Sequence, residues 1–347
     1  MYARLADDPA SAIRSLVLGD VSGLVVATSG STATPRDVYL RRDSLLASAK
    51  AAHARLAGPG RWLLAVPTDR IAGAQVLLRS ELAGTEPVPL ATGRFTAEAF
   101  AAAARRLASA TDRGVPLYVS LVPTQLTRIM REPDAARALE VFSAVLVGGG
   151  PLDAPEAPSN VVATYGATET SGGCVYGGVP LDGVEVRLDA TGRISLGGPT
   201  VADAYADGPD DALVERSGTR WFVTSDLGRY VDGRLEVLGR ADDVLITGGH
   251  KVHSASVERA IAALPGIEMA VVVGVPDLEW GQRVVALIVA DDGEPAPSAS
   301  EVRAALASSL PRFAVPKVVK RVGRIPLLDS GKIDREACRR LAAPEGP

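Results

Sequence analysis

The stretch "GLVVATSGSTATPRD", from Gly23 to Asp37, joins an apolar run to a run of small polar residues. The first half, "GLVVAT", is typical of a buried strand. In the second half, glycine lets the backbone approach an anion closely, and the hydroxyl groups donate hydrogen bonds. The stretch therefore predicts a strand that ends in a polyphosphate-binding loop. An ordinary Ser/Thr-rich surface loop is the alternative, and a Walker loop is excluded because G-x-x-x-x-G-K-[ST] is absent from the sequence.

Apolar runs and helical patterns alternate on both sides of this stretch. After "GLVVAT", strands are expected at "WLLAV", "EPVPL", "PLYVSLV" and "SAVLVGGG", with helices at 43–56, 71–82, 97–110 and 123–130. Strands separated by helices of this length predict βαβ units and a largely parallel sheet. The fold class is therefore α/β.

The pattern changes after Gly183. "VEVRLDATGRISLGG" and "GRYVDGRLEVLGR" are typical of hairpins, the second turning at Asp232-Gly233. Beyond Arg240 come two strand runs, "MAVVVGV" and "RVVALIVA", the surface loop "DDGEPAPSAS", and a helix that Ser298 and Glu301 would open as a capping box. We expect a large domain over 1–240, with mostly parallel sheets and a hairpin-rich part, and a smaller α+β domain over 241–347.

Composition excludes several function classes. The chain has 347 residues, 47% of them hydrophobic, and a formal net charge of −4. This charge gives no basic footprint for nucleic acid, and no apolar run approaches the length of a membrane span. Cys174 and Cys338 have no metal spacing and are expected to be free thiols, which fits a cytoplasmic protein. A homo-oligomer stays possible.

Four later stretches contain further candidate residues. In "VATYGATETSGG", Glu169 follows a strand and could hold Mg²⁺, or it could lie in a solvated turn. In "FVTSDLG", Asp226 could accept the hydroxyls of a ribose, or merely cap a turn. "GRADD" supplies Arg240. In "IPLLDSGKIDR", Lys332 could be functional or an ordinary surface charge.

The order and spacing of these stretches resemble the core motifs of the adenylate-forming enzymes, which include acyl- and aryl-CoA ligases, luciferases and peptide-synthetase adenylation domains. The hydroxyl/glycine loop, "GGGP", "YGATET", "TSDLG", "GRADD" and "SGKIDR" occur in register from Val25 onward. The resemblance implies the adenylate-forming fold, with a mobile C-terminal domain. It also implies that a carboxylate and ATP give an acyl-adenylate and pyrophosphate, after which coenzyme A displaces AMP.

The resemblance also implies roles for individual residues. The phosphates of ATP would lie against Arg36 and the loop residues Thr28, Ser29, Gly30, Ser31 and Thr32, and Glu169 would bind Mg²⁺. The rest of the nucleotide would lie against Gly148–Pro151 (with Gly149 and Gly150), Tyr165, Gly166, Thr168, Asp226 and Arg240. Lys332 would bridge the carboxylate and the α-phosphate, Asp242 would be the hinge, and Gly248 and Gly249 would face the thiol of coenzyme A.

Two further stretches, "PTDRIAGAQVLLRSELAGTEPV" and "YVSLVPTQLTRIM", look like the o-succinylbenzoate–CoA ligases of menaquinone biosynthesis. That acid has two carboxylates, so the enzyme needs a cation or donors for the one it does not activate. Arg79 on the helix would pair with it and Ser120 would donate a hydrogen bond. The alternative is that Arg79 points to solvent.

The sequence departs from the family pattern at three positions. Ala33 replaces a glycine of the phosphate loop, where Arg36 also replaces lysine, and Arg70 replaces a common histidine. These changes keep two alternatives open: another acyl- or aryl-CoA ligase, or a nucleotide-binding relative with impaired catalysis. His53 lies in a polar helix and is expected to be solvated.

Overall fold

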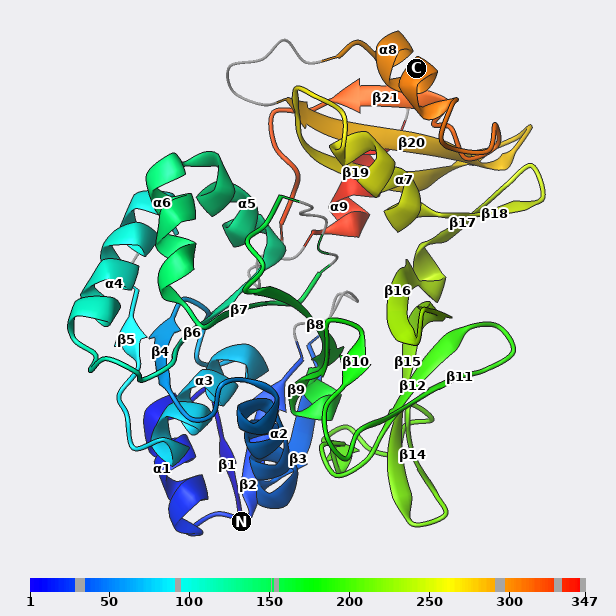
Figure 1. Ribbon diagram of the computed structural model, residues 1–347. Coiled ribbons are helices and arrows are strands. Elements are labelled where there is room, and N and C mark those ends of the chain that lie inside the picture. Colours follow the sequence, from blue (N-terminus) through cyan, green and yellow to red (C-terminus); the bar gives the residue numbers. More distant parts are fainter. Residues whose placement is uncertain are drawn as a thin grey trace. The chain divides into compact units, whose positions relative to one another are not determined.

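The computed structural model describes residues 1–28, 35–90, 95–150, 152, 156–290, 297–327 and 333–343, apart from the side chain of Asp242. Figure 1 shows the chain. It divides into two compact units, one formed by residues 1–190, 194–224 and 230–235 and the other by 191–193, 225–229 and 236–347. The predicted boundary at residue 240 lies close to the last of these limits and stays a prediction.

A seven-stranded sheet is the centre of the first unit, in the strand order β10-β9-β8-β7-β6-β4-β5. The strands from β8 to β5 run parallel, while β8–β9 and β9–β10 are antiparallel. The strands are β4 Arg61–Leu64, β5 Val88–Pro89, β6 Leu117–Leu121, β7 Ala144–Val147, β8 Val161–Ala167, β9 Gly172–Tyr176 and β10 Val179–Pro180. The predicted parallel sheet is thereby confirmed.

Helices cover both faces of this sheet (Figure 1). On one face lie α4 (Ala97–Ser109), α5 (Pro123–Arg131), α6 (Pro133–Ala138) and the short η1 (Leu139–Val141). Phe100 of α4 and Leu126 of α5 pack there against Val119 and Val145. On the other face lie α2 (Arg42–Arg55) and α3 (Ile71–Leu82), which also contact β4 and β9. Alternation along each strand therefore gives the sheet two apolar faces.

A four-stranded sheet, in the order β1-β2-β3-β13, packs on the far side of α2 and α3. Its strands are β1 Tyr2–Arg4, β2 Gly23–Ala27, β3 Asp37–Arg41 and β13 Ala204–Tyr205, and α1 (Pro9–Leu18) covers it together with α2 and α3. The hairpin β2–β3 contains the predicted phosphate loop. Because β13 pairs with β3, Tyr205 lies opposite Val38, close to the base of that hairpin.

A third sheet is built from hairpins, in the order β11-β12-β15-β14, with β16 paired to β15. The strands are β11 Glu185–Leu188, β12 Arg193–Gly197, β14 Leu213–Arg216, β15 Thr219–Val231 and β16 Arg234–Arg240. Both expected hairpins are confirmed. Asp232 and Gly233 have φ values of +49° and +75°, as a two-residue turn with both central residues left-handed requires.

The second unit contains a five-stranded sheet, in the order β18-β17-β20-β19, with β21 paired to β20. The strands are β17 Val244–Thr247, β18 His250–His253, β19 Ile267–Asp277, β20 Gly281–Ala290 and β21 Val318–Arg321. Alternate residues of β19 and β20 face α7 (Ser254–Ala262) and α8 (Ala299–Leu306) on one side and α9 (Arg335–Ala342) on the other. The capping box of Ser298 and Glu301 at α8 is confirmed.

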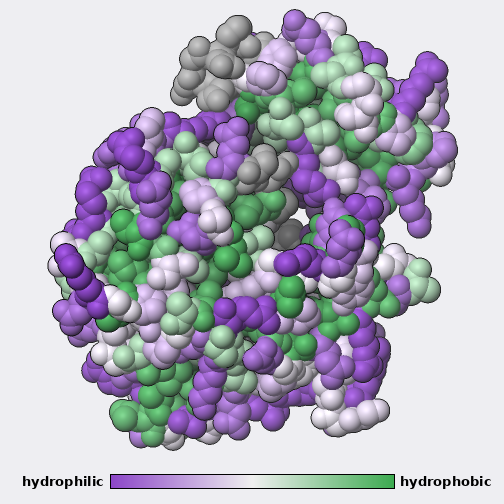
Figure 2. Space-filling model, in the orientation of Figure 1, coloured by the Kyte–Doolittle hydropathy of each residue, from purple (hydrophilic) through white to green (hydrophobic). Residues whose placement is uncertain are grey.

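The surface mixes polar and apolar residues, and the two cysteines are in the state that the sequence predicts. In the view of Figure 2, apolar residues are interspersed with polar ones. Among the residues described, no helix is long and apolar enough to cross a membrane. Cys174 and Cys338 are both free and buried, as expected.

Candidate active site

Several candidate residues of the first unit lie at or just after the carboxyl ends of neighbouring strands of the parallel sheet. Ser120 is near the carboxyl end of β6, Gly148–Gly150 follow β7, and Thr168 and Glu169 follow β8 in a short 3₁₀ turn, η2 (Thr168–Thr170). The chain passes from β4 to β5 on one side and then to β6 on the other, so the strand order reverses between β4 and β6. Open α/β sheets bind ligands outside the carboxyl ends of their strands at such a point.

Two glycines of this edge are required by close packing. A Cβ atom on Gly148 would lie 2.4 Å from Thr164 Oγ1, and one on Gly166 would lie 2.3 Å from the carbonyl oxygen of Gly172. Neither contact is possible for a side chain. Gly166 therefore has a structural role in the β8–β9 pairing, and its predicted place beside the nucleotide stays a prediction.

Thr28 and Arg36 close the base of the β2–β3 hairpin. The backbone nitrogen of Thr28 donates to the carbonyl oxygen of Arg36 at 2.7 Å, and the backbone nitrogen of Arg36 donates to Thr28 Oγ1 at 2.9 Å. Arg70, at the position of the missing histidine, donates from Nη1 to the carbonyl oxygen of Thr28 at 3.3 Å. Arg70 thus supports the same hairpin base. Ser29, Gly30, Ser31, Thr32 and Ala33 lie outside the described residues.

The guanidinium of Arg36 is held by two carboxylates and an aromatic ring. Nε and Nη2 donate to Asp207, each at 2.8 Å, and Nη1 donates to Asp210 at 2.6 Å. The guanidinium carbon lies 3.7 Å from the centre of the Tyr205 ring. Hydrogen bonding to Arg36 lowers the pKa of Asp207, so both charges of this pair persist at neutral pH. The predicted phosphate contact of Arg36 is not tested by these contacts.

The hydroxyl of the same tyrosine contacts Glu169. The hydroxyl of Tyr205 donates to Glu169 Oε1 at 2.7 Å, and the side chains of both residues are buried. No group within the described part of the chain hydrogen-bonds to Oε2. The structure thus brings Thr28, Arg36 and Glu169 together through Tyr205.

One carboxylate suits Mg²⁺ bound with a nucleotide. Among the residues described, no group of three or more His, Cys, Asp or Glu side chains could hold a metal by itself. Mg²⁺ usually keeps several waters and is bound by one or two carboxylates together with substrate phosphates. Glu169, with one oxygen held by Tyr205, fits that donor set, and the buried hydroxyl of Thr168 lies next to it in sequence.

Arg79 is buried without a carboxylate. It is 3% exposed, so the alternative that it points to solvent is wrong. Its guanidinium carbon lies 5.2 Å from the centre of the Trp62 ring, and its Nη2 makes only a long hydrogen bond of 3.4 Å to Tyr176 Oη. In the described part of the chain its Nε has no partner and no acidic side chain pairs with it.

Ser120 lies on the same face of the sheet as Arg79. Val119 and Leu121 point into the core formed with α4 and α5, so Ser120 and Tyr118 point to the side of α2 and α3. The rings of Tyr118 and Trp62 lie 4.9 Å apart, and Trp62 contacts Arg79. The two predicted acyl-substrate residues therefore share one face, although no direct contact joins them.

The expected solvation of His53 is wrong. His53 is half-buried in α2, and its Nε2 is buried without a partner among the described residues. Burial, and secondarily the charge of Arg79, lower the pKa of this imidazole below its usual value, so it is neutral at pH 7. The residue belongs to the surroundings of Arg79 and not to the solvated helix face that its polar neighbours suggested.

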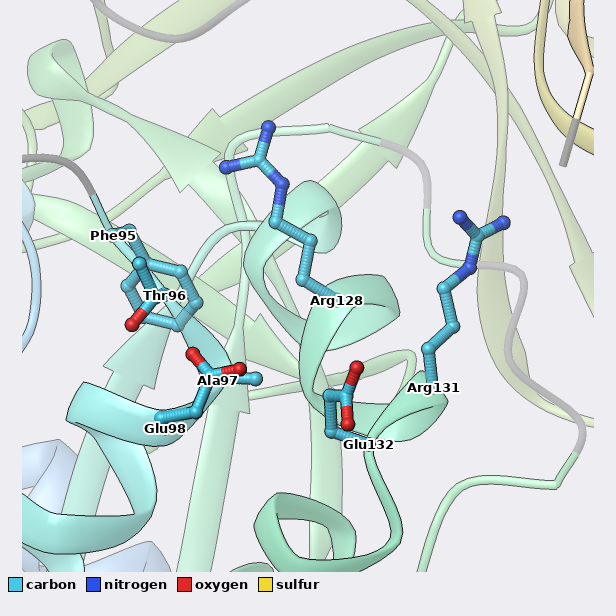
Figure 3. Close-up of a pocket in the computed structure, with 7 residues that line it drawn as sticks. All are labelled: Phe95, Thr96, Ala97, Glu98, Arg128, Arg131 and Glu132. Atoms are coloured by element: carbon cyan, nitrogen blue, oxygen red, sulfur yellow. The ribbon is translucent and has the colours of Figure 1, made fainter. Parts of the chain in front are cut away.

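A separate pocket lies at the start of α4 and the end of α5 (Figure 3). Its lining residues are Phe95, Thr96, Ala97, Glu98, Arg128, Arg131 and Glu132. It contains none of the residues predicted to bind ATP, magnesium or the acid. Phe100 and Leu126 also place α4 and α5 on the opposite face of the sheet from Arg79.

The remaining predicted residues belong to the second unit. Asp226 lies in β15, Arg240 ends β16, and Asp242 lies in the 3₁₀ turn η3 (Ala241–Asp243). Gly248 and Gly249, with φ values of +55° and +79°, form the turn between β17 and β18 and are exposed. Lys332 lies outside the described residues. The predicted roles of these six residues stay predictions.

Arg335, three residues after Lys332, forms the main ion-pair network of the second unit. Its Nε lies 2.9 Å from Asp243, and Nη1 and Nη2 donate to Glu258 at 2.8 and 3.1 Å. Burial would lower the pKa of Arg335, but the charges of Glu258 and Asp243 outweigh this and raise it. The network joins the first residue of α9 to the end of the η3 turn that contains the predicted hinge.

Tyr205, Asp207, Asp210 and Arg335 were missed by reasoning from the sequence. The first three occur in "AYADGPDD", which has the composition of an ordinary turn, and only the β13–β3 pairing brings them to Arg36. Arg335 had a usable signal because it ends the quoted "SGKIDR" motif.

Comparisons with known proteins cover both parts of the chain. The sequence profile of the AMP-binding enzyme family matches residues 24–206, and that of the AMP-binding enzyme C-terminal domain matches residues 256–332. A Mycobacterium tuberculosis (strain H37Rv) protein named probable 2-succinylbenzoate–CoA ligase is 44% identical over 338 residues, covering 94% of this chain and 86% of the relative.

Solved structures agree. The o-succinylbenzoate CoA synthetase (MenE) of Bacillus subtilis, in complex with the acyl-adenylate OSB-AMP, is 26% identical with a TM-score of 0.78, covering 94% of this chain and 70% of that chain. The same enzyme in complex with ATP and a magnesium ion is 26% identical with a TM-score of 0.77, covering 91% and 70%.

Replacing Arg335 tests the importance of its ion-pair network. Arg335 is 21% exposed in its side chain, so Arg335→Ala leaves Glu258 without its cation in a partly buried place and leaves Asp243 only the longer ion pair to Arg339, at 3.9 Å. We expect the free energy of unfolding, measured by urea titration, to fall by about 3 kcal/mol. The control is Arg229→Ala, which removes an exposed ion pair to Glu236 and should cost less than about 1 kcal/mol. An equal fall in the free energy of unfolding in the two variants would contradict a stabilising role for the Arg335 network.

Proposed function

Because this chain belongs to the AMP-binding enzymes, we propose that it is an ATP-dependent 2-succinylbenzoate–CoA ligase, which joins that acid to coenzyme A and releases AMP and pyrophosphate. The chain has the adenylate-forming fold and is an AMP-forming acid–thiol ligase. Its reactants are small molecules, and the reaction falls in menaquinone biosynthesis. A cytoplasmic location and a homo-oligomer stay predictions.

The observation that supports the choice of acid is the buried charge of Arg79. A guanidinium removed from water is costly unless an anion compensates it. No described acidic side chain does so, and a second substrate carboxylate would. A planar guanidinium can bind such a carboxylate through two parallel hydrogen bonds. A fatty acid has no second charge to offer this site.

The first half-reaction needs charge compensation more than proton transfer. A carboxylic acid with an ordinary pKa near 4 is already ionised at pH 7, so its oxygen can attack the α-phosphate without a general base. The difficulty is repulsion, since like charges about 4 Å apart repel by about 4 kcal/mol at an effective dielectric constant near 20. Orientation and fixed positive charges are therefore the main catalytic contributions.

The residues of the chain meet this need as follows. Lys332 bridges the attacking carboxylate and the α-phosphate, and Arg36 and the hydroxyls of Thr28 to Thr32 bind the β- and γ-phosphates. Glu169, aided by Thr168, would hold the magnesium ion, which would supply positive charge against the triphosphate. Gly149, Gly150, Tyr165 and Gly166 border the adenine, and Asp226 and Arg240 hold the ribose.

In the second half-reaction the thiol of coenzyme A attacks the acyl carbon and AMP leaves with the electron pair of the broken C–O bond. Rotation about Asp242 withdraws Lys332 and brings the turn of Gly248 and Gly249 to the thiol. Both exposed glycines have left-handed φ values, and the space beside the backbone of Gly249 is open. Arg79 and Ser120 hold the second carboxylate throughout.

The proposal is tested by measuring pyrophosphate release with a panel of carboxylic acids. We expect release with 2-succinylbenzoate and formation of a thioester only when coenzyme A is added. Release with benzoates or fatty acids but not with this acid would identify another acyl- or aryl-CoA ligase. ATP binding without release for any acid would identify a nucleotide-binding relative with impaired catalysis, as Ala33 and Arg70 could produce.

Arg79→Ala should act on the acid and not on ATP. Loss of a hydrogen-bonded charge pair is worth roughly 2 kcal/mol, so we expect the KM for 2-succinylbenzoate to rise about 30-fold. The KM for ATP should change by less than about twofold, which is smaller than the effect of losing one hydrogen bond. Arg79→Met, which keeps the length of the side chain, is measured alongside to separate loss of charge from loss of packing. A parallel rise in both KM values would refute the assignment.

Lys332→Ala should separate the half-reactions. We expect adenylation, followed as acid-dependent pyrophosphate release, to be nearly abolished. Thioester formation from supplied acyl-adenylate should stay close to that of the wild type, because the lysine has left the site by then. Equal damage to both steps would rule out a swinging lysine.

A further inference from the structure

We infer that Tyr205 is a positioning residue for adenylation, which holds Glu169 so that its free oxygen, Oε2, faces the magnesium ion of MgATP; this rests on the proposed function. Tyr205 is 6% exposed and Glu169 is 8% exposed, and the phenol donates to Oε1 at 2.7 Å. The carboxylate thus has one oxygen fixed by a neutral donor, and the other has no partner within the described part of the chain. That second oxygen is the one available to a cation.

The tyrosine ring is itself fixed. On its face lies the guanidinium of Arg36, 3.7 Å from the ring centre. Arg36 cannot move freely, because Asp207 binds it through two nitrogens and Asp210 through the third. A ring held in this way keeps its hydroxyl in one place, so the position of Glu169 depends on contacts that begin at Asp207 and Asp210.

The chemistry of the phenol suits this role. A phenol is an uncharged hydrogen-bond donor, and here its hydroxyl donates to Glu169 Oε1 at 2.7 Å. A lysine at this place would neutralise Glu169 and weaken its attraction for a cation.

The same contacts join the metal ligand to the phosphate loop. Arg36 is hydrogen-bonded through its backbone to Thr28, at the base of the hairpin that contains that loop. One side chain, Tyr205, therefore lies between the arginine next to the loop and the carboxylate at the end of β8. These contacts fix Glu169 relative to the base of that hairpin.

The test is Tyr205→Phe, which removes the hydroxyl and keeps the ring under Arg36. Binding is measured by isothermal titration calorimetry with MgATP and with AMP, in the absence of any acid. We expect the Kd for MgATP to rise about tenfold, since a lost hydrogen bond to a charged group is worth about 1.5 kcal/mol or more. The Kd for AMP, which needs no metal, should be unchanged, and so should thioester formation from supplied acyl-adenylate.

Tyr2→Phe is the matched control. Tyr2 lies in the same four-stranded sheet, and its hydroxyl donates to Asp203 at 2.6 Å and not to Glu169. It should bind both nucleotides as the wild type does. Wild-type affinity of Tyr205→Phe for MgATP, or an equal loss for MgATP and AMP, would overturn the inference. If the wild type activates no acid but Tyr205→Phe still loses only MgATP affinity, the proposed function fails and the positioning role stands.

Discussion

The candidate site depends on how the positive charges of its arginine side chains are compensated by anions. Two arginines of the first unit differ in this respect. Arg36 has Asp207 and Asp210 on its three nitrogens and the ring of Tyr205 beneath it, so the chain itself supplies partners that hold it in place. Arg79 is more deeply buried and has aromatic neighbours and no described carboxylate. A protein that keeps such a charge needs an anion from outside, and the proposed acid supplies one.

The fold produces these environments by sheet topology. Parallel strands bring the segments after β6, β7 and β8 to one edge, while α3 runs along one face of the same sheet and brings Arg79 over Trp62. The β2–β3 hairpin and its partner strand β13 then bring Thr28, Arg36 and Tyr205 to Glu169. The candidate site is therefore assembled from residues far apart in sequence, because each sheet joins distant segments of the chain.

Much of the fold could be predicted from local patterns. β2, β4, β6 and β7 are short apolar runs separated by helical stretches rich in alanine and leucine, and the Asp232-Gly233 turn and the Ser298 cap have specific chemistry. Long-range partners could not be predicted, since nothing in "AYADGPDD" indicates that it pairs with β3. The same limitation explains His53, whose sequence neighbours are polar but whose ring lies near Arg79. The motif-based site residues were found by resemblance, and their roles await experiment.

The most direct test of the account compares two acids in two proteins. The values of kcat/KM for 2-succinylbenzoate and for an analogue without its second carboxylate are measured in the wild type and in Arg79→Met. The account predicts that the wild type prefers the diacid by about 30-fold, equivalent to about 2 kcal/mol of charge-assisted hydrogen bonding, and that the variant shows almost no preference. The same preference in both proteins would contradict it, because the second carboxylate would then be bound elsewhere.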